Sequence, residues 1–331
     1  MPAAKNVTPD DRLELMVRVA ELYYEHHKTQ QEIADLTGIS RSAVSRLLTA
    51  ASDEGVVRIQ VVNPRSRARE LSLQLKETLG LHDALVVPTA LSDAELARLK
   101  VARAAATYLV DHLSPGDMLG VGRGHTVYET VRALPSHRRL RVSTVPLVGG
   151  LGEADAHFQV NELAHEAADR LGGKCWHLYA PAILRNRRRR EALLEDSGML
   201  QVTSHWDRLQ WALVGVGSIT DPANQFYLHA ITRFRANTGR DRVVGDVCLW
   251  FIESDGNVPL TPNAERVIGV SPDQLRRTPF VLGVAGGVRK AEAILAAVRA
   301  GLIKILVTDE LAAGAILRLV PGSPSSTTWE D

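Results

Sequence analysis

Apolar residues recur at helical spacing through the first fifty residues of the chain. Leu13, Met16, Val17 and Ala20 lie three or four positions apart, which places them on one side of a helix. The four residues 8–11, Thr-Pro-Asp-Asp, favour a helix start because they supply a capping hydroxyl, a proline and two acids. Two more short helices are predicted up to about residue 53. The run VVRIQVV at 56–62 then predicts a β-strand, since most of its residues are β-branched.

The segment at 29–48, TQQEIADLTGISRSAVSRLL, predicts two helices joined by a tight turn. Thr29 and Glu32 have the spacing of a capping box, so the first helix begins there. Gly38 falls in the turn, where glycine alone adopts a left-handed backbone at little cost. Ser40 is then expected to cap the second helix. This arrangement is typical of a helix-turn-helix.

The two helices are expected to bury one face and to offer the other to DNA. The buried positions are Ile33, Ala34, Val44, Leu47, Leu48 and Ala51. No acid occurs from Leu36 to Ser52, and the outward face combines guanidinium groups, which bind guanine edges or phosphate, with short hydroxyls. The predicted DNA-binding residues are Thr29, Gln30, Ser40, Arg41, Ser42, Ser45, Arg46 and Thr49. The alternative is a three-helix bundle that binds protein and presents only a solvated face.

From residue 84 onward, short apolar runs end in glycine or proline and alternate with helical stretches. Such alternation predicts an α/β domain with a mostly parallel sheet that is covered on both faces. The runs are ALVVP (84–88), DMLGVG (117–122), VSTVPLVGG (142–150), WHLYAP (176–181), ALVGVG (212–217), FVLGVAGG (280–287) and IKILVTD (303–309).

The length of 331 residues fits two domains, one of them large. We expect a helix-turn-helix domain at 1–62 and a linker with a connecting helix at 63–80. A ligand-binding domain is expected at 81–320, followed by a flexible tail at 321–331. The linker is recognised by NPRSRARE at 63–70, which has a proline and arginines but no apolar period.

Three glycine-rich loops are candidates for anion binding, because ligands collect where parallel strands lead into helix N-termini. The first loop is Gly122, Arg123, Gly124, His125 and Thr126, the second contains Gly149 and Gly150, and the third is Gly286 and Gly287 followed by Arg289 and Lys290. Cations at a helix start oppose the helix dipole unless an anion is bound. The alternative is that the glycines serve tight turns and the cations point into water.

Other polar positions carry weaker signals. Asp246, at the start of the predicted strand DVCLWFI, either binds a sugar hydroxyl or caps the strand end. The sequence Thr308-Asp309-Glu310 predicts an ordinary helix N-cap. Arg185 and the arginines at 187–190 form a basic run, which marks a solvated face more often than a nucleic-acid contact.

Composition bears on the possible partners, metal content and location of the protein. Net charge is +1, which neither favours nor excludes a nucleic-acid partner. With only Cys175 and Cys248 present, a reducing cytoplasm is expected and structural zinc is not. His165, followed by Glu166, lacks a third ligand at zinc spacing. We therefore expect no metal and no cofactor. No apolar run approaches a membrane span and no secretory signal is evident, so a cytoplasmic location is expected.

Several segments, in this order, resemble the SorC/DeoR-type family of sugar-binding bacterial transcriptional regulators. They are TQQEIADLTGISRSAVSRLL, GVGRGHTVYETV, LGGKCWHLYAPAI, ALVGVGSI, VVGDVCLWF, RVIGVSPDQL, VAGGVRKAEAILAAVRAG and LVTDELAAGAIL. The resemblance covers roughly residues 12–317. Two departures are His125, where relatives commonly carry arginine, and the run after Asp246.

The resemblance implies an effector domain similar to sugar-phosphate isomerases that senses a sugar, polyol or sugar phosphate without catalysis. It also implies a homodimer or homotetramer that binds operator DNA of a carbohydrate operon. The effector-site residues it implies are Gly122, Gly124, Thr126, Gly149, Gly150, Asp246, Gly286, Gly287 and Lys290. The competing functions are a sugar-phosphate isomerase or deaminase with an appended DNA-binding module, and a protein-docking module. No Ser-His-Asp or Cys-His constellation marks a catalytic centre.

Overall fold

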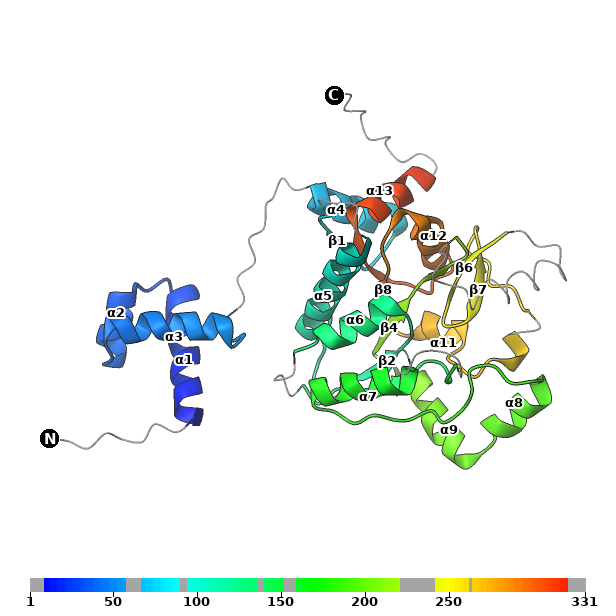
Figure 1. The fold of residues 1–331 in the computed structure, drawn as a ribbon, viewed down its shortest axis with the longest axis horizontal. Helices are drawn as coiled ribbons and strands as arrows, with labels where there is room; N and C mark the ends of the chain where they lie inside the picture. Colours follow the sequence, from blue (N-terminus) through cyan, green and yellow to red (C-terminus); the bar gives the residue numbers. More distant parts are fainter. Residues whose placement is uncertain are drawn as a thin grey trace, which may run out of the picture. The chain divides into compact units, whose positions relative to one another are not determined.

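The computed structural model describes residues 9–57, 67–89, 94–135, 140–151, 159–220, 242–261 and 264–320. The chain separates into two compact units, Met1–Pro64 and Arg65–Asp331 (Figure 1). Thr8, most of the predicted strand at 56–62 and the predicted tail at 321–331 lie outside the described residues.

The small unit consists of the helices α1 (Pro9–Tyr24), α2 (Gln30–Thr37) and α3 (Arg41–Asp53). Its interior is apolar, and Val19, Ile33 and Val44 are fully buried in it. Leu13 and Val17 of the predicted α1 stripe are exposed instead, because the buried side of α1 runs through Met16, Val19 and Ala20. Val56 and Val57 are not in a strand but pack against a second small cluster of Met16, Ala20 and Ala51.

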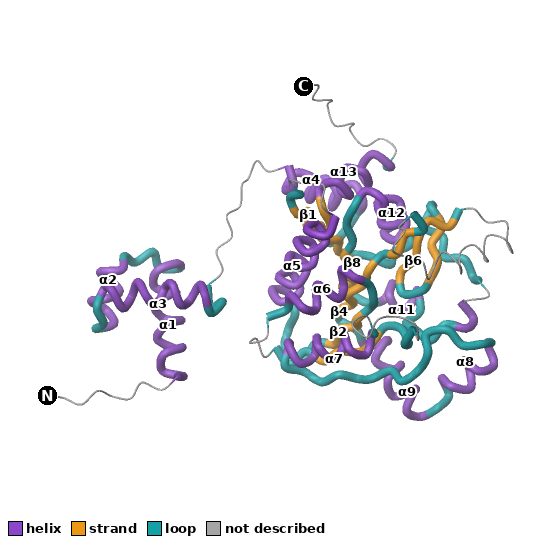
Figure 2. The backbone as a smooth tube through the Cα atoms, in the orientation of Figure 1, coloured by secondary structure: helices purple, strands orange, loops and turns teal. Residues whose placement is uncertain are grey.

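The larger unit is built on a six-stranded parallel sheet with the order β1-β9-β8-β4-β2-β3 (Figure 2). Its strands are β1 (Asp83–Val87), β2 (Met118–Val121), β3 (Ser143–Pro146), β4 (Trp211–Gly215), β8 (Phe280–Val284) and β9 (Ile305–Asp309). Each of them lies within or next to a predicted apolar run, so the parallel α/β prediction is confirmed.

Alternate side chains of each strand enter two separate cores. Trp211 and Leu213 of β4 face a core that is closed by three helices, α5 (Ala94–His112), α6 (His125–Ala133) and α7 (Val160–Leu171). Ala212 and Val214 face a second core, which is closed by α4 (Arg67–Leu79), α12 (Ala291–Arg299) and α13 (Glu310–Leu319). The sheet is thus covered on both faces, as its uninterrupted apolar strands require.

The other helices and turns in the described part of the larger unit are short. They are α8 (Arg187–Leu194), α9 (Ser197–Thr203), α11 (Pro272–Arg277) and the 3₁₀ turns η2 (Ser204–Arg208), η3 (Ala264–Arg266) and η4 (Val288–Lys290). Among the described helices, none combines the length and apolar character needed to cross a membrane.

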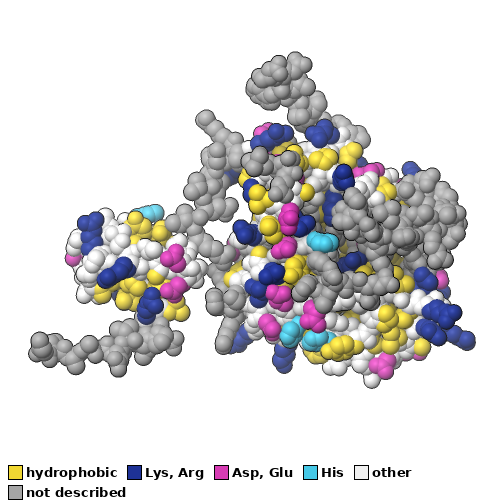
Figure 3. Space-filling view, in the orientation of Figure 1, with side chains coloured by type: hydrophobic (Ala, Val, Ile, Leu, Met, Phe, Trp, Pro, Cys, Tyr) yellow, Lys and Arg dark blue, Asp and Glu magenta, His cyan; other side chains and the backbone are white. Residues whose placement is uncertain are grey.

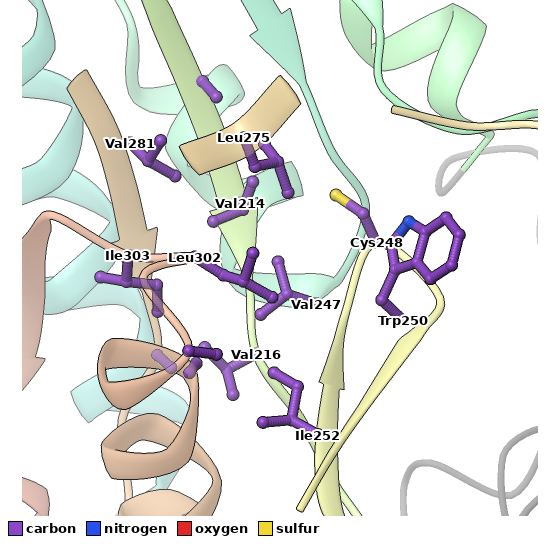
Figure 4. Close-up of a cluster of buried hydrophobic side chains, with 14 of the residues drawn as sticks. Val214, Val216, Val247, Cys248, Trp250, Ile252, Leu275, Val281, Leu302 and Ile303 are labelled. Carbon is purple, nitrogen blue, oxygen red and sulfur yellow. The ribbon is translucent and has the colours of Figure 1, made fainter. Parts of the chain in front are cut away.

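The run predicted as the single strand DVCLWFI is a hairpin. A small antiparallel sheet joins β5 (Gly217–Ser218), β6 (Val243–Val247) and β7 (Trp250–Glu253). Cys248 and Leu249 form the turn with φ of 49° and 72°, the left-handed backbone of a two-residue hairpin. Neither residue is a usual turn former, but both are buried in the second core, and Figure 4 shows Cys248 at the hairpin turn beside Trp250. Burial of these two side chains therefore outweighs the low preference of cysteine and leucine for a left-handed backbone.

The predicted strand at 176–181 is an irregular extended segment instead. It pairs with its neighbours only at isolated positions, where Cys175 lies beside Thr144 and Pro181 beside Gly150. Between these two positions, the Leu178 backbone amide donates a hydrogen bond to the side-chain oxygen of Asn161 on α7, at 2.8 Å. A side chain therefore replaces the strand partner there.

The helix expected to connect the two domains belongs to the larger unit. Ala68, Leu71 and Leu75 of α4 are buried in the second core, where α4 packs against β1 and α13.

Candidate functional site

Both helix starts of the helix-turn-helix are capped as the sequence predicts. Thr29 accepts a hydrogen bond from the Glu32 amide, and the Glu32 carboxylate accepts one from the Thr29 amide at 2.8 Å. Ser40 accepts a bond from the Ala43 amide at 3.2 Å. Gly38 has φ 71° between the two helices, so the turn uses the left-handed backbone expected of glycine. These local contacts fix the start of α3.

The predicted DNA-contacting face of α3 is exposed. Arg41, Ser42, Ser45, Arg46 and Thr49 are all solvent-exposed, whereas Val44, Leu48 and Ala51 on the opposite face are buried. Leu47, predicted as buried, is partly buried.

A surface hollow of about 820 Å³ opens at the start of α2. Its lining residues are Tyr23, Tyr24, His27, Lys28, Thr29, Gln30, Gln31 and Arg41. Three of the predicted DNA contacts, Thr29, Gln30 and Arg41, therefore share one surface with Lys28. A helix N-terminus with two neighbouring cations suits a phosphate group.

The strand order of the large sheet makes the carboxyl ends of β2 and β4 the expected place for a ligand, called the strand-reversal crevice below. The chain passes from β2 outward to β3, returns to β4 on the other side of β2, and continues through β8 to β9. Ligands of open parallel sheets bind at the carboxyl ends of the strands where the order reverses in this way. The loop after β2 directly contacts the end of β4, because a Cβ atom added to Gly215 would lie 2.8 Å from the Arg123 carbonyl.

The first glycine loop, Gly122–Thr126, lies at this reversal point. The Gly122 amide bonds the Leu213 carbonyl at 2.8 Å, which holds the loop against β4. Gly124, with φ 123°, precedes α6, and no side chain caps that helix. The start of α6 thus lies at the crevice, with Arg123 half-buried, His125 exposed and Thr126 buried beside it.

Asp246 is brought to the same crevice by the small sheet, where it lies opposite Gly217 just beyond β4. It is 5% exposed, and its Oδ2 accepts a hydrogen bond from the Leu249 amide at 3.2 Å. Burial raises the pKa of the neighbouring Cys248 thiol, the charge of Asp246 raises it further, and the charge of Arg123 opposes both. Asp246 and Arg123 are therefore close enough to act on one thiol.

The third glycine loop reaches the crevice through Lys290. This residue ends η4, the 3₁₀ turn that precedes α12, and its ammonium donates to the Val216 carbonyl at 3.1 Å. Ser218 and Thr220 hold the turn in place by donating to the Arg289 carbonyl at 3.0 and 2.8 Å. These two hydroxyls could not be predicted from the sequence, because they bind backbone from a distant part of the chain.

The backbone amide of Gly287, expected to be available to an anionic ligand, already has a hydrogen-bond partner. Its hydrogen bond goes to Asp309 Oδ2 at 2.5 Å, while Asp309 Oδ1 accepts from Ala312 and caps α13. The N-cap predicted for Asp309 is thus present, and the same carboxylate already provides the anion at this loop.

The second glycine loop is packed against protein backbone. The Gly149 amide bonds the Ile268 carbonyl at 2.9 Å, and the Gly150 amide bonds the Ala180 carbonyl at 2.8 Å. A Cβ atom at Gly149 would lie 2.6 Å from the Ala180 carbonyl. Close packing against the backbone accounts for a glycine at this position.

The comparisons with known proteins agree with this division of the chain. Residues 63–318 match the family model described as "Putative sugar-binding domain", and residues 18–53 match the model "Sigma-70, region 4". The sorbitol operon regulator of Klebsiella pneumoniae is 33% identical over 93% of this chain and 99% of its own length. The regulator LsrR of Escherichia coli K12 is 31% identical, with 92% and 95% covered.

The solved structures show the same relationship. The full-length sorbitol operon regulator SorC from K. pneumoniae superposes with a TM-score of 0.70 at 32% identity, covering 92% of this chain and 98% of its own. A sor operon regulator from Shigella flexneri gives a TM-score of 0.69 at 29% identity, covering 75% of this chain and 98% of its own. The chain therefore belongs to the SorC/DeoR-type family of sugar-binding bacterial transcriptional regulators.

Proposed function

We propose that this protein regulates a carbohydrate operon, and that a small sugar phosphate bound at the carboxyl ends of β2 and β4 changes its affinity for operator DNA. The observation that carries the proposal is the presence of two separate sites on one chain. One is the exposed face of α3, which carries no acid from Arg41 to Ser52. The other is the crevice at the strand reversal, in a domain whose relatives are operon regulators.

The crevice suits a ligand with both hydroxyl groups and a negative charge. Arg123 and Lys290 supply cations, and the start of α6 has no side-chain cap. The carboxylate of Asp246 can accept hydrogen bonds from sugar hydroxyls. We place the phosphate at α6, because at the Gly287 amide it would compete with Asp309.

Sensing without turnover fits the buried carboxylates at this crevice. An isomerase or deaminase needs a general base that reaches a proton on the sugar. Asp246 accepts the Leu249 amide, and Asp309 accepts the amides of Gly287 and Ala312. These backbone bonds hold both carboxylates in structural positions. The relatives are named as transcriptional regulators, which points the same way.

Fluorescence anisotropy tests the regulator directly. Labelled DNA from upstream of the protein's own operon is titrated with the full chain at several salt concentrations, with scrambled DNA as the control. We expect specific binding that weakens with salt, and a shift of the midpoint by a sugar phosphate but much less by the same sugar without phosphate. Equal binding to both DNAs would contradict the DNA-binding role. Turnover of a bound sugar phosphate would favour the enzyme instead.

A further inference from the structure

Three side chains with metal-binding atoms meet at the outer edge of the large sheet. They belong to different segments of the chain from the residues of the strand-reversal crevice. His165 comes from α7, while Cys175 and His177 come from the extended segment that follows it. One ligand atom of each lies within 4.8 Å of the others. In a tetrahedral zinc site the ligand atoms are roughly 3.3–3.8 Å apart, given Zn–N and Zn–S bond lengths. Small side-chain rotations therefore suffice to bring them into bonding positions.

The backbone around these residues is already fixed. The Trp176 amide bonds the Thr144 carbonyl of β3 at 2.9 Å, which holds the residues on either side of it at the sheet edge. Asn161, one helical turn before His165, bonds both the amide and the carbonyl of Leu178, at 2.8 and 3.0 Å. Asn161 thus ties the segment to α7 and Thr144 ties it to β3, so little ordering is needed to bind an ion.

A carboxylate and an aromatic ring support the two imidazoles. His165 Nε2 lies 3.4 Å from Asp169 Oδ2, the arrangement in which a carboxylate orients a ligating histidine. The His177 ring stacks on Tyr179, with centroids 5.6 Å apart and planes 6° apart.

We propose that His165, Cys175 and His177 bind a divalent transition metal of the zinc type, with Asp169 orienting His165. A thiolate with two imidazoles selects zinc, cobalt or copper over magnesium or calcium, which prefer oxygen ligands. Histidine side chains lie beside acidic ones on the surface over α7 (Figure 3), so an ion has access from solvent. When bound, it would link α7 to the segment that follows it.

Cobalt is the probe, because its absorption reports both geometry and thiolate bonding. The untagged full chain is freed of metal with a chelator, desalted and titrated with Co²⁺, and zinc is then added. We expect one cobalt per chain, visible bands of a tetrahedral site, a thiolate-to-cobalt charge-transfer band in the near ultraviolet, and loss of all bands on adding zinc. In Cys175→Ser the charge-transfer band should vanish, although Cys248 remains.

Histidine variants separate the site from non-specific binding. His165 is exposed, so His165→Gln should keep the fold while weakening zinc binding by more than the roughly 10–100-fold expected of Asp169→Asn. His112→Gln, at the exposed end of α5, is the matched control and should bind like wild type. Zinc should raise the melting temperature of wild type and of His112→Gln, but not of His165→Gln. Absence of cobalt bands in wild type, or an unchanged charge-transfer band in Cys175→Ser, would overturn the proposal.

Discussion

The carboxylate of Asp309 accepts a hydrogen bond from the Gly287 amide, with 2.5 Å between Oδ2 and the nitrogen. Asp309 ends β9 and Gly287 follows β8, so one side chain joins the carboxyl ends of two neighbouring strands. Its other oxygen caps α13 through Ala312. This buried group therefore fixes the position of η4, and with it Lys290.

Asp309→Asn should destabilise the protein. An amide side chain has a single acceptor oxygen, so one of the two backbone amides would lose its partner in a buried position. The expected loss is about 1–3 kcal/mol of unfolding free energy, measured by chemical denaturation. Asp273→Asn is the control, since its carboxylate forms an exposed ion pair with Arg276 and should matter little. Equal stability of the two variants would show that the Asp309 bonds are not important.

Lys290→Ala should uncouple effector sensing from DNA binding. Removing the ammonium at the end of β4 takes away a charge-assisted bond to a phosphorylated effector, worth about 1.5–3 kcal/mol. Operator affinity without effector should stay close to wild type, because Lys290 belongs to the larger unit. The measurement is a titration of the operator complex with effector. Arg289→Ala, which removes an exposed neighbouring cation, is the control, and an unchanged effector midpoint in Lys290→Ala would refute the assignment.

Arg41→Ala and Arg46→Ala should each weaken specific operator binding while leaving the fold intact. Both side chains are exposed on α3, and a lost base contact costs about 1–3 kcal/mol. Anisotropy titrations measure the affinity, and circular dichroism checks the helices. Arg18→Ala removes the same charge from the exposed side of α1 and should have a smaller effect. If both α3 variants bound like wild type, α3 would not be the recognition helix.

Gly149→Ala and Gly150→Ala should differ, although the residues are adjacent. A Cβ atom at Gly149 would meet the backbone of Ala180 and Ala182 at 2.6 and 2.7 Å, and backbone cannot move aside cheaply. The expected cost is about 1–3 kcal/mol. At Gly150 the nearest atom is 3.5 Å away on the flexible Gln159 side chain, so a change within about 0.5 kcal/mol is expected. Thermal melts of both variants decide the point; a reversed order would mean that the packing is different.

The protein should assemble at least as a dimer. One small helix-turn-helix offers too few contacts for tight specific binding, so two are expected to read half-sites about one DNA turn apart. Analytical ultracentrifugation with and without operator DNA measures this. A monomer that binds an isolated half-site as tightly as the full operator would contradict the prediction.

Where the structure depends on residues that are close together in the sequence, the sequence alone was sufficient to predict it. The caps at Thr29 and Ser40, the turn at Gly38 and the six strands of the parallel sheet all depend on local pattern. The hairpin turn at Cys248 and Leu249 was missed because its left-handed backbone is stabilised by burial and not by turn-forming residues.

The crevice was only partly predictable for a similar reason. That Gly122, Asp246 and Lys290 converge at the end of β4 follows from strand order, which spacing along the chain does not contain. The same holds for His165 and Cys175, which have no metal-binding spacing and meet only because Asn161 and Thr144 hold the segment after α7 in place.

The pairing of the first strand with the last governs the order in which this protein can fold during synthesis. Asp83 of β1 lies opposite Ile305 of β9, and β1 is an edge strand of the described sheet, so its strand partner is among the last parts to be made. The helix-turn-helix unit ends at Pro64 and can fold on the ribosome well before that. A chain that ends before Ile305 would therefore retain the helix-turn-helix unit that binds DNA. The sheet of the effector domain, however, would lack β9 and could not be completed.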